Sequence, residues 1–200
     1  MNKCKIIEKS TQMFLDLGFK SVTMDDIANE SGMSKKTIYQ YFKNKKELVS
    51  ACVNDLIDFI QNGICCVKKE ELNAIEEHME VRKFVIRSLK NEKSSPQHQL
   101  EKYYPGIFKD ARTRHFSLMT DSVKENIEKG MKEGLYRGDL DPDIVSKIYF
   151  LATVELKNQN VFPQENYDLF HLMDILSEYH LRALLTPKGV LEFEKLNKNQ

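Results

Sequence analysis

The residues best suited to chemistry lie between positions 34 and 46. This stretch, SKKTIYQYFKNKK, combines lysines, hydroxyl groups, a side-chain amide and two tyrosines. Lysines and hydroxyl groups bind phosphate oxygens, whereas an amide can bind the edge of a base. Ile38 and Phe42 are four residues apart, so in a helix they share one apolar face. The other faces then carry the polar groups, which are Lys35, Lys36, Thr37, Tyr39, Gln40 and Tyr41. The pattern is typical of a helix that binds double-stranded DNA.

The neighbouring elements are predicted to hold this helix in place. Thr23, with Asp26 three residues later, predicts the start of a short helix. Gly32 ends that helix, and Ser34 caps the next one, which is expected over residues 35–42. Two short helices joined by a glycine-containing turn form a helix-turn-helix, whose second helix enters the major groove. Longer helices are expected before and after this unit, over residues 3–17 and 45–67. Lys45 and the N-terminus of the later helix together favour a phosphate.

Charge is distributed unevenly along the chain. The protein has 200 residues, with 30 basic and 30 acidic side chains. Residues 1–50 contain nine lysines against six acidic residues, a net charge of +3, so the rest carries −3. A basic N-terminal segment is expected to meet an anion. The longest apolar stretch, residues 148–154, is far too short to span a membrane, and the first ten residues do not resemble a signal peptide. A cytoplasmic location is therefore expected.

The sequence contains no recognisable catalytic or metal-binding pattern. The cysteines Cys4, Cys52, Cys65 and Cys66 lack the spacing of a zinc site, and are expected to be reduced thiols that act as small core residues. The histidines form no metal-binding pair, and the motifs of nucleotide loops and nucleophilic hydrolases are missing. Residues 76–78, Glu-Glu-His, are expected on a charged, solvated helix face. We therefore expect no catalytic residue, no metal and no cofactor, and do not expect an enzyme.

The segment from residue 3 to residue 50 resembles the DNA-binding head of the TetR family of bacterial transcriptional regulators. The matching motifs are Gly18-Phe19, TMDDIA at residues 23–28, Gly32-Met33-Ser34, TIYQYF at residues 37–42, and then Lys45 and Leu48. Several motifs in the same register are far more specific than a lone helix-turn-helix. A weaker resemblance, at residues 127–136 and 139–142, is to the junction between the seventh and eighth helices of the family.

The resemblance implies an all-α fold of about nine helices, three of them in the head. It implies a homodimer that represses transcription from a near-palindromic operator until a small apolar or amphipathic molecule releases it. Thr23 and Ser34 match positions that commonly hold phosphates, and Lys45 matches the lysine before the fourth helix. Residues 35–37 match the leading end of the recognition helix, and Tyr39 and Tyr41 match residues that contact the DNA backbone and thymine methyl groups. Two positions depart from the common pattern, because Lys36 replaces a small residue and Gln40 replaces arginine or histidine. The operator sequence therefore cannot be taken from relatives.

Three segments are expected along the chain: a DNA-binding domain over residues 1–47, a ligand-binding and dimerisation domain over residues 48–186, and a polar tail over residues 187–200. The helices expected near residues 142–158 and 167–185 are apolar on more than one side, so each must bury more than one face. The resemblance implies that these helices form a four-helix dimer bundle. The predicted interface residues are Ile148, Leu151, Leu172, Leu176 and Tyr179. The predicted ligand pocket contains Phe59, Phe84, Tyr104, Phe108, Phe116, Met119, Tyr149 and Phe150.

Two other classes of function remain open at this point. One is a helical module that binds small molecules or a protein partner without sequence-specific DNA binding. The other is a helical enzyme acting on an apolar substrate, which the missing catalytic cluster disfavours. Salt dependence separates the first from a DNA-binding regulator, because DNA affinity falls by a slope of about −0.9 per phosphate contact.

Overall fold

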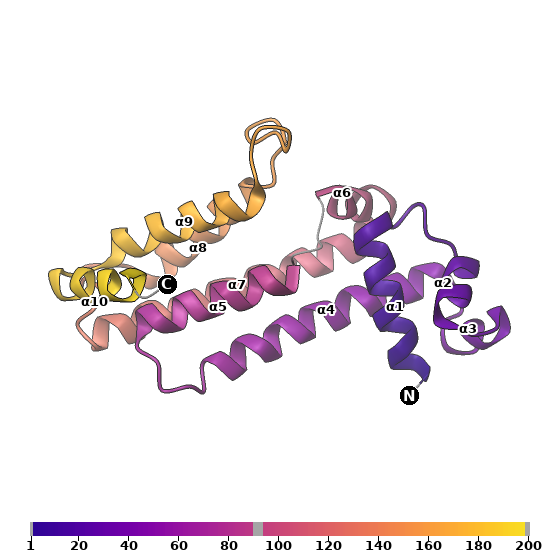
Figure 1. Ribbon diagram of the computed structural model, residues 1–200, viewed down its shortest axis with the longest axis horizontal. Coiled ribbons are helices and arrows are strands. Elements are labelled where there is room, and N and C mark those ends of the chain that lie inside the picture. Colours follow the sequence, from indigo (N-terminus) through magenta and orange to yellow (C-terminus); the bar gives the residue numbers. More distant parts are fainter. Residues whose placement is uncertain (1, 90–93, 199–200) are drawn as a thin grey trace. The chain divides into compact units, whose positions relative to one another are not determined.

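The structure, a computed structural model, describes residues 2–89 and 94–198 (Figure 1). This part of the chain contains ten helices and no β-strand, apart from a single bridge between Tyr136 and Leu185. The predicted all-α class is confirmed. The helices are α1 (Asn2–Leu17), α2 (Met24–Ser31), α3 (Lys35–Tyr41), α4 (Lys45–Val67), α5 (Ala74–Leu89), α6 (Ser94–Tyr103), α7 (Pro105–Lys132), α8 (Pro142–Glu155), α9 (Leu169–Leu184) and α10 (Pro187–Lys198).

The first of two compact units comprises residues 1–62 and 88–115. It holds α1 to α3, most of α4, all of α6 and the beginning of α7, and is therefore larger than the segment 1–47 of the sequence analysis. Its core is continuous across these helices, since Ile6 of α1, Ile38 of α3 and Leu48 of α4 are fully buried together. Leu100 of α6 joins the same core, and the backbone N–H of Lys20 donates to Gln99 Oε1 at 2.8 Å. The start of the recognition helix thus rests on a well-packed scaffold.

The second compact unit comprises residues 63–87 and 116–200. It holds α5, α8, α9, α10 and most of α7. Tyr136, which follows α7, is almost completely buried, and its hydroxyl donates to the Ala74 carbonyl at 3.1 Å and to Asn126 Oδ1 at 3.2 Å. The predicted start of α8 is confirmed, because Asp141 accepts two backbone N–H groups and Pro142 occupies the first helical turn. The Asp141 cap fixes where α8 begins, and the buried Tyr136 ties the end of α7 to the start of α5.

The expected polar tail is wrong for the residues that the structure describes. Residues 187–198 form α10, and residues 199–200 lie outside the described part of the chain. Val190, Phe193 and Leu196 are three residues apart, so they line one helical face, and all three contact the core of the second unit. Gly189 allows the close approach, since a Cβ atom there would lie 2.2 Å from the Leu135 carbonyl oxygen. The polar composition of this segment concealed a narrow apolar face.

The solvated face expected at residues 76–78 is also wrong for two of its three members. Glu77 and His78 are buried in the second unit. Glu77 accepts from Lys129 Nζ at 2.6 Å and from Asn126 Nδ2 at 3.0 Å, so its charge is balanced inside the fold. Buried charges persist where partners of this kind are present. The partners come from α7, which is distant in sequence, and no local pattern could reveal them.

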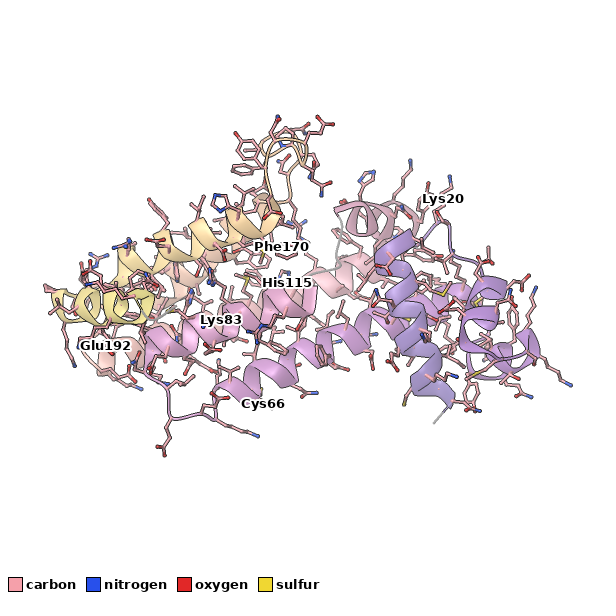
Figure 2. The ribbon with its side chains drawn as sticks, viewed as in Figure 1. Lys20, Cys66, Lys83, His115, Phe170 and Glu192 are labelled. Atoms are coloured by element: carbon pink, nitrogen blue, oxygen red, sulfur yellow. The ribbon has the colours of Figure 1, made fainter. Side chains whose placement is uncertain are left out.

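The cysteines only partly match their expected role. All four are free thiols, but Cys52 alone is buried, whereas Cys4, Cys65 and Cys66 are exposed. Burial raises the pKa of the Cys52 thiol to about 12. The exposed Cys66 projects from the last turns of α4 (Figure 2).

No helix among the described residues is long and apolar enough to cross a membrane. No cluster of three or more potential ligands that could hold a metal ion occurs among them either.

Candidate nucleic-acid interface

The first helix of the helix-turn-helix, α2, begins with a complete capping box. The Thr23 hydroxyl accepts from the Asp26 backbone N–H at 3.2 Å, and the Thr23 backbone N–H donates to Asp26 Oδ2 at 2.8 Å. The Thr23 hydroxyl also donates to the same carboxylate, and these hydrogen bonds lower the pKa of Asp26. The spacing predicted from sequence is thus confirmed, and the helix start is fixed by its own side chains.

The turn between α2 and α3 depends on glycine and serine. Gly32 adopts the left-handed conformation, with φ of 65°, and its N–H bonds back into the last turn of α2. The N–H of Met33 donates to the Ala28 carbonyl at 2.9 Å, which completes the helix end. Ser34 then caps α3 by accepting from the Thr37 N–H at 3.1 Å. The turn sets the direction in which α3 leaves α2.

The recognition helix α3 separates its buried face from its exposed faces. Ile38 is fully buried and Phe42, at the C-cap, is nearly so. Tyr39 and Tyr41 are 42% and 39% exposed, so both side chains are accessible from solvent. The predicted DNA-contacting side chains are exposed except Thr37 and Lys45, which are half-buried; the exposed ones are Thr23, Ser34, Lys35, Lys36, Tyr39, Gln40 and Tyr41. Their contacts with DNA remain a prediction.

The lysines of this surface differ in their surroundings. Lys35 forms an ion pair with Asp25 at 2.7 Å, which raises the pKa of Lys35. Lys45 donates to the Lys20 carbonyl at 3.4 Å, and partial burial lowers the pKa of its ammonium group. Lys36 forms no ion pair with another residue that the structure describes. Lys36 thus offers its full charge to an incoming phosphate, whereas Lys35 must share its charge with Asp25.

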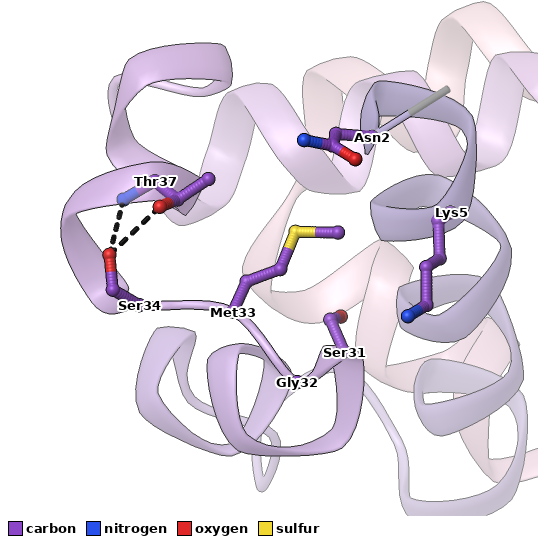
Figure 3. A pocket seen from close by; sticks show the side chains of 7 residues that line it. All are labelled: Asn2, Lys5, Ser31, Gly32, Met33, Ser34 and Thr37. Carbon is purple, nitrogen blue, oxygen red and sulfur yellow. Dashed lines mark hydrogen bonds between the residues drawn. The ribbon is translucent and has the colours of Figure 1, made fainter.

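A hollow beside α3 was not anticipated from the sequence. It is lined by Asn2 and Lys5 of α1, by residues 31–34 of the turn, and by Thr37 of α3 (Figure 3). The Ser34 hydroxyl bonds to both the N–H and the hydroxyl of Thr37 on one side of it. The lysines near the N-terminus were visible in the sequence, but their place beside the turn depends on how α1 packs.

The predicted dimer residues fall into two groups in the second unit, where α8 and α9 lie side by side (Figure 1). Ile148, Leu151 and Tyr179 are 60%, 58% and 74% exposed. Leu176 is half-buried, and Leu172 is buried within its own chain. Ile175, which is not among the predicted interface residues, is 53% exposed on α9. The two helices therefore present several large apolar side chains to solvent.

The predicted pocket residues are divided between the units. Tyr104 and Phe108 pack against the core of the first unit, which also contains the exposed Phe59. The second unit contains the others, which are Phe84, Phe116, Met119, Tyr149 and Phe150. The rings of Phe116 and Phe150 meet edge to face, with 5.0 Å between their centroids. Whether these residues line a ligand site remains a prediction.

A buried polar cluster in the second unit joins α5, α8 and α9. His78 Nε2 lies 2.9 Å from the Ser177 hydroxyl, and the Tyr149 ring stacks on the His180 ring at 4.0 Å. Burial lowers the pKa of His78 to about 3 and that of His180 to about 4, so both are neutral at pH 7. The sequence predicts Tyr149 in a pocket but carries no signal for its histidine neighbours.

The capped α2, the left-handed turn and the exposed α3 define a DNA-binding protein of the helix-turn-helix class. Residues 6–52 match the family model described as bacterial regulatory proteins, tetR family. This match assigns the N-terminal segment of the chain to the TetR family of bacterial regulatory proteins.

Similarity to other proteins covers most of the chain. The repressor KstR2 of Mycobacterium tuberculosis is 22% identical over 148 residues, which cover 70% of this chain and 72% of KstR2. A regulatory protein TetR from Rhodobacter sphaeroides has a TM-score of 0.73 at 14% identity, covering 92% of this chain and 98% of that one. The fatty acid degradation regulator FadR from Bacillus halodurans has a TM-score of 0.69 at 18% identity, covering 90% and 94%. These structures share the fold of both units.

Proposed function

We propose that the protein is a homodimeric, ligand-responsive transcriptional repressor that binds a near-palindromic DNA operator in the cytoplasm. The proposal gives it a binding function and no catalytic one. The observation that carries it is α3, whose apolar residues are buried in the head while its tyrosines, Lys36 and Gln40 face solvent. Such a helix places hydrogen-bonding groups at base edges and phosphates without disturbing its own packing.

The exposed apolar residues on α8 and α9 support the dimer. Monomeric proteins rarely expose a contiguous apolar patch of large side chains, and such patches usually mark an interface. Pairing α8 and α9 with the same helices of a second copy would cover Ile148, Leu151, Ile175 and Tyr179. A two-fold dimer requires a near-palindromic site, with its recognition helices about 34–36 Å apart for successive major grooves.

An effector acts in this scheme by favouring a dimer whose heads are wrongly spaced for DNA. Its effect on DNA binding equals its differential affinity for the two arrangements. Support for a buried effector comes from Arg82 Nε and His180 Nε2, which are buried and have no hydrogen-bond partner among the described residues. Buried polar atoms in folded proteins nearly always have a partner. FadR, whose structure is similar, is a fatty acid degradation regulator, which is consistent with an apolar or amphipathic effector.

The decisive experiment is selection of binding sites from a random duplex library with the purified full-length protein. The result expected is enrichment of a near-palindrome whose half-sites are about one helical turn apart. The same selection with Tyr39→Ala should lose the enriched sequence. Tyr103→Ala is the matched control, because Tyr103 is 41% exposed in the same unit but lies on α6.

Two results would contradict the proposal. A wild-type protein free of bound small molecules that enriches no sequence is not a sequence-specific regulator. Mass spectrometry of the denatured protein establishes whether a small molecule was bound during purification. Enrichment of a single half-site in the selection would support DNA binding but contradict the dimer.

A further inference from the structure

The hollow beside α3 carries an unbalanced positive charge. Among the described residues that line it, Lys5 is the one with a charged side chain, and no carboxylate accompanies it. Lys5 is exposed and forms no ion pair with another described residue. Its neighbour on the same helix, Lys9, is different, because Lys9 Nζ lies 3.7 Å from Glu30 Oε1. Lys5 is therefore a cation of this hollow that no described carboxylate neutralises.

The floor of the hollow contains an unpaired hydroxyl. Ser31 is 1% exposed, and its Oγ has no hydrogen-bond partner among the described residues. In Figure 3 the ends of the Ser31 and Lys5 side chains lie toward one another, with Met33 between them and α3. Asn2 adds an amide at the rim. Hydrogen-bond donors around a lysine ammonium group make a site suited to an anion with several oxygen atoms.

We propose that this hollow binds a backbone phosphate of the operator, so that α1 forms a second DNA contact beside the helix-turn-helix. Lys5 supplies the charge, and Asn2 and Ser31 supply hydrogen bonds. The inference rests on the proposed function and adds a contact that its motifs do not include.

The position of the hollow favours a phosphodiester over a free anion. Ser34 and Thr37, which form one wall, belong to the start of α3, the helix proposed to enter the major groove. A groove is bordered by phosphates, so a duplex docked on α3 brings backbone oxygens over this wall. The contact is independent of base identity, because a phosphate is the same at every step of the sequence.

The test measures operator affinity by fluorescence anisotropy across a series of salt concentrations, with the duplex obtained by selection. Lys5→Gln should weaken binding about fivefold at low salt, an effect typical of one charge-assisted contact. The loss should be equal for the operator and for an unrelated duplex. The slope of log affinity against log salt should become shallower by about 0.9 for each bound head, because one fewer counterion is released.

Lys9→Gln is the matched control. It removes the same charge from the same helix, but its ammonium group is paired with Glu30 and lies outside the hollow. It should leave the salt slope unchanged. An equal change in both variants would show an effect of net charge alone and would overturn the proposed contact.

A second arm locates the phosphate on the DNA. A series of operators is prepared, each with one neutral methylphosphonate at a different position of either strand. The affinity of each operator is measured for the wild type and for Lys5→Gln. One position should weaken wild-type binding and have no effect on Lys5→Gln, because the partner is already missing in that variant. If wild-type protein binds its operator but no such position exists, and the salt slope of Lys5→Gln is unchanged, the inference is wrong while the proposed function stands. Failure of the wild type to bind DNA would overturn both.

Discussion

At the scale of single residues, the turn before α3 depends on one backbone conformation. Gly32 has φ of 65°, and a Cβ atom there would meet no other atom within 4 Å. Gly32→Ala therefore tests backbone strain without a steric clash. A left-handed alanine costs about 1–2 kcal/mol, so the free energy of unfolding in urea should fall by about that amount.

Gly138→Ala is the control for this substitution. Gly138 also has open space around its Cα, but its φ is not positive. Its unfolding free energy should stay within about 0.5 kcal/mol of the wild-type value. Equal losses in the two variants would show that the left-handed conformation is not the cause.

The buried histidines predict a dependence of stability on pH. Folding lowers the pKa of His78 to about 3 and of His180 to about 4, from an ordinary 6.5. The unfolded chain therefore binds more protons between these values, so stability is fully present above pH 6.5 and is lost as the pH falls. The slope should approach about 1.4 kcal/mol per pH unit for each histidine.

Urea unfolding between pH 7 and pH 4.5, at one protein concentration, measures this slope. His180→Phe keeps an aromatic ring beside Tyr149 and removes one titrating group. It should remove about half of the slope in this window. A slope that His180→Phe leaves unchanged would place the acid sensitivity elsewhere, such as the carboxylates of Asp26 and Asp143, whose pKa values are lowered.

Residues in the helix-turn-helix were predictable because their determinants are local. Thr23 and Asp26, or Ser34 and Thr37, are three residues apart, so the sequence itself displays each cap. The pairing of His78 with Ser177 joins positions 99 residues apart, and nothing near either residue indicates the other. The place of Lys5 could not be predicted for the same reason, because the hollow that it lines is formed by α1 and the turn after α2 together.

At the scale of elements, α8 and α9 make a testable prediction about assembly. Leu151→Glu places a charge on a side chain that is 58% exposed, so folding of the single chain should be little affected. Burying that charge in a dimer interface is strongly unfavourable. Light scattering after size exclusion should give the mass of one chain for the variant and of two chains for the wild type.

Leu191→Glu controls for a charge placed on an exposed leucine. Leu191 is 63% exposed on α10, outside the predicted interface. This variant should remain dimeric. If Leu151→Glu remains dimeric, the interface does not include this part of α8.

Helix types and most helix ends followed from capping residues, glycines and prolines. The α8 start at Asp141-Pro142 is one case, and the α4 span from Lys45 to Val67 is another. The missed element, α10, has three apolar side chains among charged ones, and its stability depends on the core that they contact. A short helix of this kind is decided by tertiary packing rather than by its own propensity.

At the scale of the whole molecule, the formal charge is zero and the sequence pI is about 7.0. Residues 1–50 carry +3 and the rest −3, so the basic segment of one molecule can attract the acidic segment of another. Solubility at low salt should be lowest near pH 7 and should rise when salt screens the attraction. Precipitation measured across pH at low and high salt tests this, and a minimum that added salt deepens would contradict it.

The division of α3 into buried and exposed faces has a consequence for the evolution of the protein. Ile38 and Phe42 hold the helix in its scaffold, whereas Lys36 and Gln40 contribute little to that packing. Substitutions at the exposed positions change operator preference while leaving stability near its original value. A duplicated gene could therefore acquire a new set of target promoters through a few such changes, with the scaffold and its assembly retained.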